Sequence, residues 1–68
     1  MKVAKVSIGE IDIILHPTSD GFRVLLSRGV AIVEGEDSPW NIGTIRIGEK
    51  ATTTDGTVIA VIDEEQTK

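Results

Sequence analysis

The sequence contains no cysteine and only two aromatic residues, Phe22 and Trp40. Without cysteine the chain has neither a disulfide nor a thiolate metal site, and nothing in it favours an oxidising compartment. Two rings are too few for a platform on which single-stranded bases stack within one subunit. The net charge of −4 also opposes non-specific binding to a phosphate backbone, although it leaves room for a local basic patch.

Long apolar runs are absent as well. The residues after Met1 lack the apolar segment of about 7–15 residues that is typical of a signal peptide. No stretch approaches the roughly 18 consecutive apolar residues of a membrane-spanning helix. We therefore expect a cytoplasmic protein that does not enter a membrane.

No catalytic, cofactor or metal motif stands out. His16 is the only histidine, and it precedes Pro17 in a polar segment, so we interpret it as a loop residue without a chemical role. Glu34, Glu36 and Asp37 form a carboxylate cluster, but they lack the alternating ligands and the glycine of a calcium loop and are interpreted as solvated charges. The sequence thus predicts a protein that is not an enzyme and holds no cofactor or metal.

The length of 68 residues predicts one small domain over residues 1–62, followed by a charged tail at 63–68 that frays. A domain of this size buries only about 60% of the surface that its unfolded chain exposes, so its stability is marginal. Because no disulfide is available, we expect the chain to gain stability by forming a homo-oligomer.

Seven glycines divide the sequence into short intervals that are rich in isoleucine, valine and threonine, the β-branched residues that suit strands. We expect an all-β fold, a small antiparallel meander of about six short strands in a compact sandwich or an open barrel. The expected strands are residues 2–8, 11–15, 22–27, 30–33, 44–54 with a bulge at Gly48, and 57–62.

The segment from Asp20 to Glu34 has the strongest pattern, two strands around Gly29. The first of them alternates, and the second is apolar at four successive positions, which predicts cover on both faces. We expect tight hairpins at Gly9-Glu10 and at Asp55-Gly56. Loops are expected at 16–21 and at 35–43, and the longer one is a candidate for recognition.

Alternation assigns faces to the expected strands. It points Ala4, Val6 and Ile8 to one side and turns Ile11, Ile13, Leu15, Ile45 and Ile47 inward. Several aliphatic residues then lie on the opposite faces without cover in one chain, and burial of each is worth about 1.5–3 kcal/mol. They are Ile14, Leu25, Val33, Ile59 and Val61. We assign the subunit interface to Leu25, Val33, Ile59 and Val61 together with Trp40.

Trp40 has two interpretations. It closes one end of the core of its own subunit, or it inserts into a neighbouring subunit or a protein partner, because tryptophan is enriched at the centres of interfaces. The run Thr52-Thr53-Thr54 also has two interpretations, an exposed edge strand or a row of ligand-binding hydroxyls.

Two segments resemble a known family: Asp-Gly-Phe-Arg-Val-Leu-Leu-Ser-Arg-Gly at 20–29 and Thr-Ile-Arg-Ile-Gly-Glu at 44–49. They are similar to segments of the trp RNA-binding attenuation protein, a ring of small β subunits that binds tryptophan between subunits and RNA on its rim. The resemblance implies that Ser27, Arg28 and Gly29 lie in a tryptophan-contacting turn and that Arg46 contacts RNA. Thr52 and Thr53 are further ligand candidates, and Lys50 is a further nucleic-acid candidate.

These observations leave two function hypotheses. The first is a non-enzymatic β protein that self-associates and acts as a binding or scaffolding module, with a protein partner possible. The alternative is a ring-forming regulator that binds a small ligand or RNA, as the resemblance implies.

Overall fold

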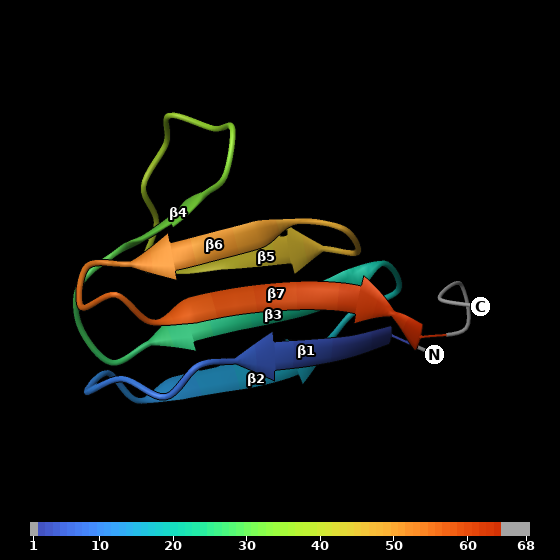
Figure 1. Cartoon of the computed structure of the whole chain (residues 1–68), viewed down its shortest axis with the longest axis horizontal. Coiled ribbons are helices and arrows are strands. Elements are labelled where there is room, and N and C mark those ends of the chain that lie inside the picture. The colour runs from blue at the N-terminus through green and yellow to red at the C-terminus, as the bar shows by residue number, and fades with distance from the viewer. Residues whose placement is uncertain (1, 65–68) are drawn as a thin grey trace.

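Two antiparallel sheets face each other in the computed structural model, which describes residues 2–64 (Figure 1). The fold is all-β, as predicted, but it has seven strands where six were expected. The strands are β1 (Lys2–Val6), β2 (Ile13–Pro17), β3 (Gly21–Leu26), β4 (Ala31–Val33), β5 (Ile42–Arg46), β6 (Lys50–Thr53) and β7 (Val58–Asp63). Strand β7 extends one residue past the predicted domain boundary at Ile62, and most of the predicted tail, residues 65–68, lies outside the described residues.

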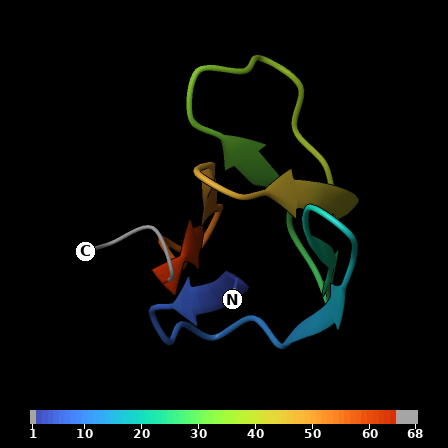
Figure 2. The ribbon, with the colours of Figure 1, turned by 90° about the vertical axis from the view of Figure 1, so that its right-hand side faces the viewer.

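The four-stranded sheet has the order β1-β7-β6-β4, and the three-stranded sheet has the order β2-β3-β5. Figure 2 shows the two sheets on opposite sides of the molecule. Only β2–β3 and β6–β7 are sequential neighbours that pair, so most connections cross from one sheet to the other. The predicted hairpin at Asp55-Gly56 is one of these two pairs.

The predicted hairpin at Gly9-Glu10 is wrong, because β1 pairs with β7 and β2 pairs with β3. The amides that would close a hairpin turn have another acceptor: Glu10 N and Ile11 N donate to the Asp55 carboxylate at 2.7 and 3.2 Å. At the same end Ser7 N donates to the carbonyl of Val58, which continues the pairing of β1 with β7. The first connection therefore crosses between the sheets.

The predicted strand through Gly48 is also wrong. Gly48 has φ +89° and lies in a turn, which the Glu49 amide closes by donating to the Arg46 carbonyl. The amide of Arg46 in turn donates to Glu49 Oε1 at 2.7 Å. This turn separates β5 from β6 and sends them into different sheets. Thr52 and Thr53 accordingly lie on β6, which has neighbours on both sides, and Thr54 lies in the turn that follows. The interpretation of the threonine run as an edge strand is therefore wrong.

The core lies between the sheets and draws on both. Val33, Ile59 and Val61 are 5%, 0% and 1% exposed within the single chain, so the prediction that they lack cover there is wrong. The physical reason is that the prediction of faces assigned the strands to a single sheet with one inward face. With two sheets, each supplies one inward row. The buried apolar residues are Ile11, Val24, Leu26, Ala31, Val33, Ile45, Ala51, Ile59 and Val61.

Three isoleucines that were expected to be covered are exposed. Ile8 is 99% exposed because β1 ends at Val6, and Ile47 is 40% exposed because it lies in the turn after β5. Ile32 is 47% exposed because β4 alternates, with Ala31 and Val33 inward, and is not covered on both faces.

The predicted loop at 16–21 is shorter than expected. His16 and Pro17 belong to β2, and the turn is closed by the Thr18 amide donating to the Gly21 carbonyl at 2.9 Å. Proline is tolerated there because β2 is at the edge of its sheet, where one side of the backbone has no ladder partner. Among residues 2–64 there is no helix long and apolar enough to cross a membrane.

Candidate functional site

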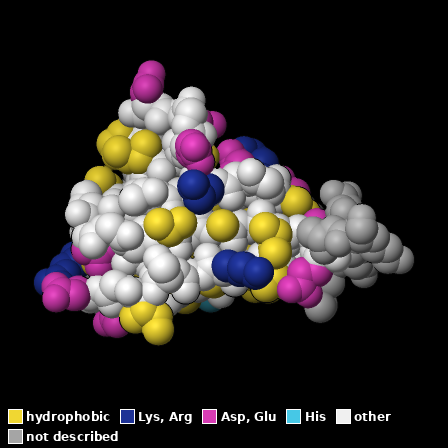
Figure 3. Space-filling view, in the orientation of Figure 1, with side chains coloured by type: hydrophobic (Ala, Val, Ile, Leu, Met, Phe, Trp, Pro, Cys, Tyr) yellow, Lys and Arg dark blue, Asp and Glu magenta, His cyan; other side chains and the backbone are white. Residues whose placement is uncertain are grey.

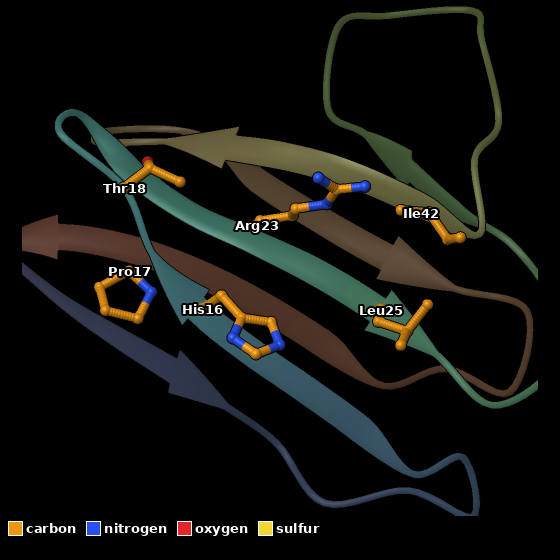
Figure 4. Close-up of a pocket in the computed structure, with 6 residues that line it drawn as sticks. All are labelled: His16, Pro17, Thr18, Arg23, Leu25 and Ile42. Carbon is orange, nitrogen blue, oxygen red and sulfur yellow. The ribbon is translucent and has the colours of Figure 1, made fainter.

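The outer face of the three-stranded sheet is hollowed into an open groove of about 540 Å³ (Figure 4). All three strands and the turn after β2 contribute to it. The lining residues are His16, Pro17, Thr18, Arg23, Leu25 and Ile42.

One half of this face is an apolar row that crosses all three strands. The register pairs Ile14 with Leu25, and Leu25 with Ile42. Ile14 and Ile42 are 50% and 49% exposed, and Leu25 between them is half-buried. Because side chains directly opposite each other on paired strands are in contact range, the three form one continuous apolar surface.

The other half of the face is polar and carries a free cation. The next row in the register joins His16, Arg23 and Thr44. Among residues 2–64, no carboxylate lies within ion-pair distance of Arg23, whereas its neighbour Arg46 is held by Asp20 at 3.2 Å. The groove therefore offers an apolar surface beside an unpaired guanidinium, which suits an occupant that combines apolar groups with negative charge.

The structure distributes the five predicted interface residues. Leu25 lies at the centre of the apolar row on the outer face, where a partner can reach it. Val33, Ile59 and Val61 lie in the core and are not available to a partner. Trp40 packs against the core of its own chain, and its backbone exchanges two hydrogen bonds with Ala31, of 2.6 and 2.9 Å.

The predicted ligand turn lies at one end of the sandwich. Ser27 is joined to Asp12 by two hydrogen bonds, of 3.0 and 3.1 Å, and Arg28 reaches Glu10 at 3.8 Å. Gly29 has φ +74° and lies so close to Thr54 that a side chain at position 29 would collide with it. This end of the molecule thus joins three segments that are distant in the sequence.

The two predicted threonine ligands do not share that site. Thr52 is exposed on the outer face of the four-stranded sheet, opposite Ile32. Thr53 is 5% exposed and faces the core, and its hydroxyl donates to Asp55. The five candidates for a ligand are therefore divided among a turn, an outer face and the core.

Asp55 is the polar centre of the same end of the sandwich. Its carboxylate accepts hydrogen bonds from Thr53 Oγ1 and from the amides of Glu10, Ile11 and Thr57. The donors from Thr53 and then Thr57 hold the pKa of Asp55 well below its ordinary value, because they stabilise the charged form. These hydrogen bonds join the first connection to the β6–β7 hairpin, so the cluster has a structural role.

The two predicted nucleic-acid contacts lie on different sheets. Arg46 is on the outer face of β5 and is paired with Asp20, and Lys50 is on the outer face of β6 and is paired with Glu34 at 3.3 Å. They do not form one basic patch. Within residues 2–64, no three histidine, aspartate or glutamate side chains lie close enough together to hold a metal ion.

Sequence reasoning missed His16, Arg23 and Ile42 as groove residues. It placed His16 and Ile42 in loops because of the neighbouring proline and glycine. The alternation Ile14-Leu15-His16 was the available signal, since it extends the second strand and turns His16 to the same side as Ile14. Comparisons of this chain with protein-family models, with curated proteins and with solved structures found no match.

Proposed function

We propose that this chain is a non-enzymatic cytoplasmic binding or scaffolding module that associates with copies of itself through the outer face of the three-stranded sheet. The observation that carries this proposal is the apolar row of Ile14, Leu25 and Ile42, which the strand register makes continuous. Burial of a Leu or Ile side chain contributes about 1.5–3 kcal/mol when complete, so covering this row gives a marginal domain a useful gain.

The chemistry of the groove favours binding over catalysis. A catalytic site requires a nucleophile or a general base that is held by a second group. Around the groove the polar side chains are His16, Thr18 and Arg23, and they line an open surface instead of an enclosed pocket. Such a face suits a macromolecular partner, including a second copy of the chain.

The test uses two isoleucines of nearly equal exposure on opposite outer faces. Ile42 is 49% exposed on the three-stranded sheet, and Ile32 is 47% exposed on the four-stranded sheet. We expect wild-type protein to sediment above the 7.3 kDa of one chain at micromolar concentration. Ile42→Asp should return the mass to that of one chain, while Ile32→Asp should leave the assembly intact. A wild-type mass of one chain throughout this range contradicts the proposal.

The alternative function is a ring-forming regulator that binds a small ligand or RNA. It rests on the family resemblance, which assigns the Ser27-Arg28-Gly29 turn to tryptophan binding, and on the exposure of all three residues of this turn. Titration with tryptophan and with single-stranded RNA tests it. Saturable binding of either, lost in Arg28→Ala or Arg46→Ala respectively, would favour the alternative.

A further inference from the structure

We propose that the acidic connection between β4 and β5 of one copy docks into the groove on the three-stranded sheet of a second copy, and that the exchange is reciprocal. This inference rests on the proposed self-association and names the two surfaces that meet. The acidic connection comprises residues 34–41, and the groove comprises the six lining residues given above.

Charges of opposite sign occupy different parts of the molecule. Nearly all described cations lie on strands. Those on strands are Lys2, Lys5, Arg23, Arg46 and Lys50, and Arg28 lies in a turn. The described carboxylates lie in connections, apart from Asp63 on β7 and Glu64, which follows it; they are Glu10, Asp12, Asp20, Glu34, Glu36, Asp37, Glu49 and Asp55. The sheet faces are thus basic and the connections acidic, so the electrostatic partner of a sheet face is a connection.

The acidic connection projects from the sandwich (Figures 1 and 2). Glu34 at its start is paired with Lys50. Glu36 and Asp37 are exposed, and among residues 2–64 no cation lies within ion-pair distance of either. The end of the connection is fixed by the two backbone hydrogen bonds between Trp40 and Ala31. The connection therefore presents two carboxylates that are unpaired among the described residues, and its C-terminal end is anchored to β4.

The groove carries the complementary features. Arg23 is unpaired among the described residues, and none of the residues that line the groove is acidic. Leu25 and Ile42 beside it offer apolar contact to the non-charged part of the connection, which includes Pro39. An unpaired cation and two unpaired carboxylates on one molecule form a self-complementary pair of surfaces, as a two-fold dimer requires.

The other basic face is a weaker partner for the groove. On the four-stranded sheet Ala60 is flanked in the register by Lys5 and Lys50, and Figure 3 shows apolar side chains with basic ones on either side. Packing this face on the groove would bring like charges together, which costs free energy. The acidic connection of the same copy does not cover its own groove, because it rises from the sheet edge beside Ile42 (Figure 4).

Charge reversal tests this inference in solution with the full chain. Arg23→Glu alone, and Glu36→Lys with Asp37→Lys in a second variant, should each raise the dissociation constant of the self-complex by about tenfold or more, because attraction becomes repulsion. Mixing the two variants should restore association, since each contact in the mixed dimer is again between opposite charges. The matched control is Lys5→Glu on the other sheet, which should leave the dissociation constant unchanged. All positions are exposed, and circular dichroism checks that each variant is folded.

The outcomes separate this inference from the proposed function. If wild-type protein associates but both reversal variants associate equally well, self-association stands and the docking of the connection is overturned. If Arg23→Glu weakens association but the mixture with the other variant does not restore it, the groove binds a different surface and the inference is again overturned. A wild-type protein of one-chain mass overturns both.

Discussion

The indole ring of Trp40 lies directly against the backbone of Gly43. A β-carbon at position 43 would be 2.7 Å from Cδ2 of the ring and 2.9 Å from Cγ, closer than such atoms approach. Gly43 is on β5 opposite Val24, which is fully buried, so the ring covers this end of the core. The structure therefore agrees with the first interpretation of Trp40, in which the ring packs against the core of its own subunit.

Gly43→Ala should therefore destabilise the fold. The added methyl group forces the indole or the strand to move, and overpacking of this kind costs about 1–3 kcal/mol. Thr44→Ala, on the exposed face of the same strand, is the control and should change the free energy of unfolding far less. Urea denaturation of both variants is the measurement. Equal stability of Gly43→Ala and wild type would show that the ring is not held at this position.

The fluorescence of Trp40 should be blue-shifted and independent of protein concentration, because the ring packs on its own core. Trp40→Ala should lose stability, but less than the about 3–5 kcal/mol of a fully buried tryptophan, since the residue is only half-buried. Emission that shifts to the red on dilution, in step with the loss of oligomer, would instead place the ring in a contact between subunits.

Val33→Asp should unfold the protein at every concentration. Val33 is 5% exposed inside one chain, and an unpaired carboxylate buried there costs about 3–5 kcal/mol. The neighbouring variant Ile32→Asp places the same charge on the outer face and should keep the fold. Circular dichroism over a range of concentrations compares them. A folded Val33→Asp protein of reduced mass would show that Val33 lies at an interface and not in the core.

Because of Asp55, the free energy of unfolding should decrease as the pH is lowered in the acid range. The pKa of Asp55 is lower in the folded state than in the unfolded state, so the folded state binds fewer protons. The stabilisation that Asp55 contributes to the folded state is therefore complete above about pH 5. It is lost progressively as the pH falls below the ordinary aspartate value of about 3.9 and on toward the lower folded-state pKa. Asp55→Asn should therefore melt at a lower temperature than wild type near pH 7.

The difference in melting temperature between wild type and Asp55→Asn should shrink between pH 5 and pH 2, measured by thermal circular dichroism. Asp12→Asn, at an exposed carboxylate without an ion pair among residues 2–64 and outside the proposed contact between copies, is the control and should match wild type near pH 7. A difference that stays constant across this range would show that protonation of Asp55 is not linked to folding.

Much of the local structure could be predicted from the sequence. Apolar patterning located β1, β3 and β7 to within two residues at each end, and Asp55-Gly56 marked the β6–β7 hairpin. Ile14 was expected to face outward and is 50% exposed. These features depend on the two-residue period of strands and on the backbone freedom of glycine, which are properties of short segments.

The candidate site was predicted only in part. Leu25 was assigned to an interface and lies in the apolar row, but Ile42 was assigned to a loop and Arg23 was given no role. These residues become neighbours only through the pairing of β3 with β2 and β5. Pairing partners are set by the whole chain, and no local pattern encodes them.

The sequence by itself determined that the chain is all-β and, to within two residues, where five of the seven strands begin and end. Only the tertiary structure decided which sheet each strand joins. Asp55 draws the Glu10 and Ile11 amides away from a hairpin, and Gly48 turns the chain out of the three-stranded sheet. Because two facing sheets bury the inward row of each, Val33, Ile59 and Val61 became core while Ile14, Leu25 and Ile42 remained at the surface.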